Sequence, residues 1–144
     1  MEPVTRQLDD AEATHRWGFE LGTGAKPGQV FALVGTLGAG KTALTRGIAE
    51  GWGVPALNEV VSPTYALMFD HPAPRGRLVH IDLYRLDSLE SVLGLGIEEA
   101  IADRSALVVI EWADRIPELI PEHATWITLR ADDAGGRIAR MGFG

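Results

Sequence analysis

The sequence predicts an α/β fold, a three-layer α/β/α sandwich around a mixed sheet, from three observations. The apolar segment QVFALVG (29–35) leads through a glycine-rich loop into KTALTRGIAEGWG (41–53), which has helical periodicity. A second segment, ALVVIEW (106–112), has the near-continuous apolar character of a central parallel strand. Two pairs of strand-like segments are joined by connections too short for parallel crossovers, so antiparallel strands are expected beside the parallel ones.

Residues 9–22 precede the first strand and are predicted to form an amphipathic helix. Asp9, followed three residues later by Glu12, has the pattern of a capping box. Apolar residues recur along this segment at helical spacing, namely Ala13, Trp17 and Leu21. Gly22 is expected to end this helix, and Gly53 is expected to end the helix that follows the glycine-rich loop.

The rest of the chain supplies the other predicted elements. They are strands at 65–69 and 78–82 joined by the turn DHPAPRGR, short helices at 87–94 and 97–104, and a terminal hairpin of strands at 125–130 and 137–141. Asp87 is expected to cap the first short helix, with Glu90 behind it. No repeat or change of composition divides the chain, so residues 1–144 are expected to form a single domain.

Charge and composition limit the classes of function. With a net charge of −7, a pI of about 5.0 and no run of Lys or Arg, the chain lacks the clustered cations of a broad nucleic-acid surface. The absence of cysteine excludes a disulfide framework and a thiolate metal site. No apolar run approaches the roughly 18 residues of a membrane span, and the acidic start MEPVTRQLDDAEA lacks the apolar core of a signal peptide. A cytoplasmic protein without membrane attachment is therefore expected.

The stretch GTLGAGKT (35–42) has the spacing of a nucleotide phosphate-binding loop, or P-loop. Its glycines allow the backbone to wrap tightly and to aim successive N–H groups at phosphate oxygens. Lys41 is expected to reach the β- and γ-phosphates, and the Thr42 hydroxyl to bind magnesium at the start of the following helix. The other expected contributors to the nucleotide site are Thr36, Leu37, Gly38, Ala39, Gly40 and Ala43. An accidental glycine-rich turn is the alternative, but a position between strand and helix favours the phosphate-binding loop.

Such a loop needs a carboxylate at the end of an apolar strand to organise magnesium. Asp82 follows LVHI and Glu111 follows ALVVI, so both are candidates. One can hold the metal while the other orients or deprotonates the attacking water, and the spacing leaves open which does which. The expected metal ligands are thus Thr42, Asp82 and Glu111, and the expected catalytic residues are Lys41, Asp82 and Glu111. The alternative for either residue is a carboxylate without a role in the site, exposed to solvent at the end of its strand.

Several absences narrow the class of nucleotide-binding protein. No Asn/Thr-Lys-x-Asp segment is present to read guanine, and Asp82 begins DLYR rather than an Asp-x-x-Gly switch. No arginine-rich lid for a second substrate is visible, and Arg75 with Arg77 is expected to lie in a solvated turn. The four histidines show no paired ligand spacing, and His80 is expected to be a structural strand residue. Three tryptophans are expected to pack in the core, namely Trp17, Trp52 and Trp126.

Five stretches, GTLGAGKT, VVSPTYAL, HIDLYRL, LGIEE and VVIEWADRI, stand in the order and spacing of one family. Over roughly residues 10–130 the sequence resembles TsaE, the ATPase required for bacterial threonylcarbamoyladenosine modification of tRNA. The resemblance implies that Ser62, Pro63 and Thr64 form a switch-like loop facing the nucleotide. It also implies that Asp82 is the Walker B carboxylate, and that Glu111 and Trp112 form a Glu-Trp pair beside the active site. Tyr65 departs from the phenylalanine often found at its position.

The resemblance also implies cofactors and partners. ATP and Mg²⁺ are the expected ligands, and the TsaB and TsaD subunits are the expected partners, with tRNA contacted only through TsaD. Hydrolysis, weak in the isolated chain, is expected to reset the TsaB–TsaD complex between turnovers. Two functions are the alternatives to an accessory ATPase. One is a stand-alone small-molecule kinase, which transfers phosphate to an acceptor, and the other is a nucleotide-gated binding module with negligible turnover.

Overall fold

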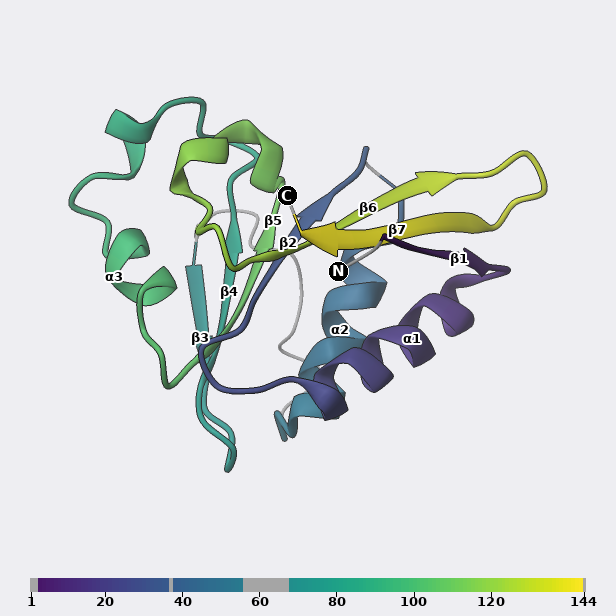
Figure 1. The fold of residues 1–144 in the computed structure, drawn as a ribbon, viewed down its shortest axis with the longest axis horizontal. Helices are drawn as coiled ribbons and strands as arrows, with labels where there is room; N and C mark the ends of the chain where they lie inside the picture. Colours follow the sequence, from purple (N-terminus) through teal and green to yellow (C-terminus); the bar gives the residue numbers. More distant parts are fainter. Residues whose placement is uncertain (1–2, 37, 56–67, 144) are drawn as a thin grey trace.

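A computed structural model describes residues 3–36, 38–55 and 68–143, and within these ranges seven strands form one sheet (Figure 1). The strands are β1 (Val4–Leu8), β2 (Val30–Val34), β3 (Met68–His71), β4 (Leu78–Asp82), β5 (Leu107–Glu111), β6 (Thr125–Ala131) and β7 (Arg137–Phe143). Their order across the sheet is β1-β7-β6-β2-β5-β4-β3. Among the helices of the described ranges, none combines the length and the hydrophobicity of a membrane span.

The centre of the sheet is parallel and both edges are antiparallel. β2 pairs in parallel with β5 and β6, and β4 pairs in parallel with β5. β3 runs antiparallel to β4, β7 to β6, and β1 to β7. The predicted mixed sheet and both predicted hairpins are therefore confirmed. β1 was not predicted, because four of its five residues are exposed and its partner strand lies at the other end of the chain.

Helices cover both faces of this sheet, as Figure 1 shows. The longer helices α1 (Ala11–Gly24) and α2 (Lys41–Trp52) lie together on one face. The short helix α3 (Ile97–Ile101) lies on the other face, with the 3-10 turns η2 (Leu89–Val92), η3 (Ala113–Arg115) and η4 (Pro117–Leu119). Side chains of β2 alternate between the two cores: Phe31 and Leu33 pack toward α1 and α2, whereas Val30 and Ala32 pack toward α3. The predicted three-layer architecture is thus confirmed.

The ends of three helical segments differ from expectation. The Asp10 carboxylate, not that of Asp9, caps α1 by accepting a hydrogen bond from Ala13 N at 2.7 Å. This helix continues past Gly22 to Gly24, because Gly22 is buried against α2 rather than placed at a turn.

The helix expected at 87–94 is only the turn η2, which Ser88 caps instead of Asp87. The predicted helix at 97–104 is shorter, ending at Ile101. Residues 65–67 of the strand expected at 65–69 lie outside the described ranges, and its described part begins β3.

Glycines allow α1 and α2 to touch backbone to backbone. A Cβ atom built on Gly22 would lie 2.1 Å from the carbonyl oxygen of Ile48, and one built on Gly47 would lie 2.1 Å from that of His15. Corresponding distances are 2.5 Å from Gly18 to the Leu44 oxygen and 2.2 Å from Gly51 to the Phe19 oxygen. No larger residue fits at this crossing, so the position of α2 against α1 is fixed by close backbone contact.

Arg75 is exposed in the turn, as expected, and its guanidinium also joins three elements. Its guanidinium donates to the carbonyl oxygens of Ala25 at 2.6 Å and Gly22 at 3.0 Å, at the end of α1. It also lies 4.1 Å from the ring centroid of Trp52, the last residue of α2. The hairpin turn between β3 and β4 is thereby fastened to the ends of both long helices.

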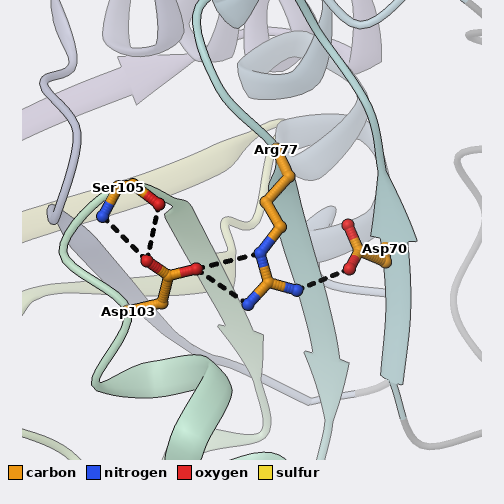
Figure 2. A network of polar contacts seen from close by, with 4 residues as sticks. All are labelled: Asp70, Arg77, Asp103 and Ser105. Atoms are coloured by element: carbon orange, nitrogen blue, oxygen red, sulfur yellow. Dashed lines mark hydrogen bonds and ion pairs between the residues drawn. The ribbon is translucent and has the colours of Figure 1, made fainter.

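Arg77 was also expected to be solvated and forms a network instead, shown in Figure 2. Its guanidinium pairs with Asp70 of β3 at 2.5 Å and with Asp103 at 2.9 Å. Asp103 also accepts hydrogen bonds from the backbone N–H and the hydroxyl of Ser105, just before β5. These bonds with Ser105, together with Arg77, lower the pKa of Asp103 to about 2. The network ties β3, β4 and β5 together at the ends away from the phosphate-binding loop.

Candidate functional site

The glycine-rich loop connects the end of β2 to α2. Gly38 and Gly40 have φ angles of 78° and 101°, in the left-handed region that favours glycine. Gly40 is the residue before α2, and among the described residues no side chain caps this end of the helix. The first N–H groups of a 12-residue helix thus point into the loop, where the helix dipole also favours an anion. Leu37, one of the expected contributors, lies outside the described residues.

Lys41 lies at the mouth of this loop with only 5% of its surface exposed. Its ammonium group donates hydrogen bonds to the carbonyl oxygens of Gly35 and, at 2.8 Å, Thr36. Burial lowers the pKa of Lys41, while the negative charges of nearby acids oppose that shift. These acids are, in order of effect, Glu111, Asp82 and Asp114. The structure therefore brings the loop lysine and both candidate carboxylates together.

The two carboxylates come from neighbouring strands that end side by side. Asp82 and Glu111 are paired in the register of β4 and β5, and both lie on the face that packs toward α2. Asp82 Oδ1 accepts a hydrogen bond from Tyr84 N at 2.9 Å. Burial raises the pKa of Asp82, and the charge of Glu111 adds to this rise, while the Tyr84 N–H opposes it. A positive charge bound between these groups would relieve the repulsion between the two carboxylates.

His80, predicted to be a structural strand residue, lies buried in β4 and also contacts the candidate site. Its Nε2 lies 2.5 Å from Oε2 of Glu111, and both side chains are buried. Since the carboxylate is an acceptor, Nε2 carries the proton of this hydrogen bond. His80 Nδ1 is buried and has no hydrogen-bond partner in the described part of the chain. The sequence could have indicated this position, because side chains alternate along a strand and His80 stands two residues before Asp82. The two side chains therefore share a face of β4.

Trp112 covers the lysine from the end of β5. Its ring centroid lies 4.2 Å from Lys41 Nζ and 4.8 Å from the centroid of the Tyr84 ring. The Arg115 guanidinium lies 5.5 Å from the Trp112 ring centroid and 5.3 Å from that of Tyr84. Among the described residues, Trp112 is the one non-glycine residue with a positive φ, 57°. Such a backbone conformation is costly for a bulky residue and is typical of functional sites.

The residues present fit magnesium bound together with a nucleotide. No group of three or more His, Cys, Asp or Glu in the described ranges could hold a metal by itself. Magnesium does not need such a group, because it commonly takes one or two carboxylates and completes its shell with phosphate oxygens and water. Thr42 in the first turn of α2, Asp82 and Glu111 supply oxygen donors of that kind. Ser62, Pro63 and Thr64, the expected switch-like loop, lie outside the described residues together with Tyr65.

Comparison with known proteins finds one family over most of the chain. The family described as "Threonylcarbamoyl adenosine biosynthesis protein TsaE" matches residues 8–139. A "tRNA threonylcarbamoyladenosine biosynthesis protein TsaE" from Treponema pallidum (strain Nichols) is 38% identical over 137 residues, covering 95% of this chain and 96% of the relative. A relative with the same name from Nostoc sp. is also 38% identical, covering 93% of this chain and 82% of its own. Among solved structures, YdiB from Bacillus subtilis matches with a TM-score of 0.79 and 26% sequence identity, over 99% of this chain and 87% of that one.

Proposed function

The chain belongs to the TsaE family of tRNA threonylcarbamoyladenosine biosynthesis proteins, and we propose that it is a magnesium-dependent ATPase. The observation that carries the proposal is the meeting of Lys41, Asp82 and Glu111 at the mouth of the glycine-rich loop. A lysine ammonium at the loop, a strand-end carboxylate for the metal and a second buried carboxylate for the water are the parts that phosphoryl transfer to water requires.

Each residue has a role in this proposal. The loop N–H groups and the Lys41 ammonium hold the triphosphate, and Thr42 with Asp82 would hold magnesium. When bound, the metal supplies positive charge that offsets the charge on the phosphate oxygens. Glu111, steadied by His80, orients a water molecule and takes a proton from it. The water oxygen bonds to the γ-phosphorus, the bond to the β–γ bridging oxygen breaks, and ADP and phosphate leave.

We also propose a role for the chain in the biosynthesis of threonylcarbamoyladenosine. The chain acts in the cytoplasm as an accessory subunit of the TsaB–TsaD complex, and hydrolysis resets that complex between turnovers. The net charge of −7 supports a division of labour in which TsaD, rather than this chain, binds the tRNA. Slow hydrolysis by the isolated chain and faster hydrolysis in the complex are expected if the partners complete the site.

A phosphate-release assay with ATP or GTP, with and without magnesium and the TsaB–TsaD pair, tests the proposal. Free phosphate should appear with ATP and magnesium, and ATP should bind more tightly than GTP because no guanine-reading segment is present. Phosphate transfer to an added small-molecule acceptor would instead indicate a kinase. Nucleotide binding with no turnover, even with both partners, would indicate a gated binding module.

The two lysines of the chain offer a matched pair of variants for the same assay. Lys41→Ala should lose productive nucleotide use, because the triphosphate loses its charge-assisted contact. Lys26→Ala removes an exposed lysine near the end of α1 and should behave as the parent protein. Hydrolysis by Lys41→Ala at the parental rate would remove the loop from the mechanism.

A further inference from the structure

We propose that Arg137 is a positioning residue that holds the phosphate-binding loop in the shape that receives the nucleotide. One terminal nitrogen of its guanidinium donates to the carbonyl oxygen of Gly38 at 2.7 Å, across 99 residues of sequence. The other donates to the carbonyl oxygen of Gly136 at 2.9 Å. The inference rests on the proposed nucleotide binding and adds a residue that the motifs of the chain do not contain.

The hairpin turn between β6 and β7 fixes the point from which Arg137 extends. Asp132 accepts hydrogen bonds from Gly136 N at 2.8 Å and from Ala134 N at 2.9 Å. The bond from Gly136 is also the main reason that the pKa of Asp132 is lowered. A Cβ atom on Gly136 would lie 2.6 Å from the Leu8 carbonyl oxygen, so the turn packs tightly against the end of β1. The backbone from which the Arg137 side chain extends is therefore held in place by the turn.

The loop peptide that Arg137 contacts is held from both sides. The carbonyl of Gly38 and the N–H of Ala39 belong to one planar peptide unit and point in opposite directions. Arg137 binds the carbonyl, and the N–H donates to the carbonyl oxygen of Thr36 at 3.1 Å. These two bonds fix the plane of the peptide, and with it the path by which the chain enters α2. A loop fixed in this way loses less conformational freedom when phosphate binds.

Arg137 also places a positive charge against the loop. A Cβ atom built on Gly40 would lie 3.8 Å from both Cγ and Nε of Arg137, so the side chain lies along two of the loop glycines. Its Nε is buried and has no hydrogen-bond partner among the described residues. An arginine at this place attracts a polyphosphate in addition to shaping the loop.

The test compares Arg137→Ala and Arg137→Lys with a control from the same strand. Arg140→Ala removes an exposed arginine that lies on the other face of β7 and whose side chain makes no hydrogen bond or ion pair within the described ranges. Affinity for a fluorescent ATP analogue with magnesium, KM and kcat are measured for each variant without partners. Hydrogen exchange of the peptide spanning 35–42 is measured in the absence of nucleotide.

Arg137→Ala should weaken nucleotide affinity and raise KM by about tenfold, the effect of one charge-assisted hydrogen bond. Its kcat should change little, because Glu111 and His80 are untouched. Exchange in the loop should accelerate in Arg137→Ala, less in Arg137→Lys, and not in Arg140→Ala. Arg137→Lys should recover part of the affinity through its charge.

Unchanged loop exchange and unchanged affinity in Arg137→Ala would overturn the inference, and so would an equal loss of affinity in Arg140→Ala. If Arg137→Ala does not fold, unchanged affinity and loop exchange in Arg137→Lys would overturn it instead. A parent protein that binds no nucleotide would contradict the proposed function, while loop exchange would still decide whether Arg137 holds the loop.

Discussion

His80 and Glu111 form a buried hydrogen bond between β4 and β5, with 2.5 Å between Nε2 and Oε2. Replacing His80 by Leu leaves the buried Glu111 carboxylate without this donor. We expect His80→Leu to lower the free energy of unfolding by about 1–3 kcal/mol and to lower kcat more than it raises KM. His80→Gln, which keeps a donor, should recover part of both losses. The measurements are urea unfolding and steady-state hydrolysis.

His15→Gln is the control for this pair, because His15 bonds Glu50 at the surface, where such pairs contribute little. If His80→Leu alters KM alone, the bond does not serve the chemical step.

Asp82→Asn should make the protein more stable and less able to use magnesium. Burial raises the pKa of Asp82 above its value in the unfolded chain, so the folded state binds the proton more readily. The ionised carboxylate therefore costs stability at neutral pH, and stability falls as pH rises through the interval between the two pKa values. Asparagine removes the charge but keeps the acceptor for Tyr84 N. Thermal unfolding should show a higher Tm for Asp82→Asn at pH 7, with a smaller difference at acidic pH.

Glu111→Gln, compared with Asp82→Asn, distinguishes the roles of the two carboxylates. It should retain nucleotide binding and slow hydrolysis, whereas Asp82→Asn should lose the magnesium dependence of binding. Titration with nucleotide in the presence and absence of magnesium distinguishes the two. Loss of binding in Glu111→Gln with retention in Asp82→Asn would mean that their roles are reversed.

Trp112→Ala should impair hydrolysis stimulated by TsaB–TsaD more than basal hydrolysis. The ring packs against Lys41, Tyr84 and Arg115, so it forms the surface over the lysine that a partner would meet. Rates with and without partners are compared for Trp112→Ala and for Trp126→Ala, which alters a half-buried tryptophan on β6. An equal fractional loss of both rates would place Trp112 in the basal chemistry instead.

Asp103→Asn should reduce stability at neutral pH and remove part of the protein's sensitivity to acid. The pKa of Asp103 is lowered from 3.8 to about 2, so the ionised group stabilises the fold at pH values above its ordinary pKa. This contribution is lost as the pH falls from 3.8 toward 2. Urea unfolding at several pH values compares the parent, Asp103→Asn and the exposed control Asp133→Asn. A parallel loss in both variants would show that the network of Figure 2 adds nothing specific.

The local parts of the fold and site could be predicted from the sequence. β2 and β5 are short apolar runs, and the loop glycines have a spacing that few other structures require. Asp82 and Glu111 could be singled out as site candidates because each is the last residue of an apolar strand, and the structure places them side by side. Such features depend on neighbours in the sequence, which is why composition and spacing reveal them.

The missed features depend on contacts between distant residues. β1 is exposed and polar, and it becomes a strand through pairing with β7. His80 acquires its role from Glu111 on another strand, and Arg137 from a loop near the opposite end of the chain. Sequence spacing does not reveal which distant residues these groups contact, although the strand period does place His80 on the same face as Asp82.

The backbones of α1 and α2 are in direct contact where the two helices cross. The four glycines at this crossing are Gly18, Gly22, Gly47 and Gly51. Even a methyl group at any of them would lie within 2.5 Å of a carbonyl oxygen on the other helix, so variants that fold should keep all four. Exposed neighbours such as Arg16 and Glu20 are free to diverge. The outer surface of the helix pair can therefore change in sequence without altering the angle between α1 and α2, and with it the position of Lys41 at the start of α2.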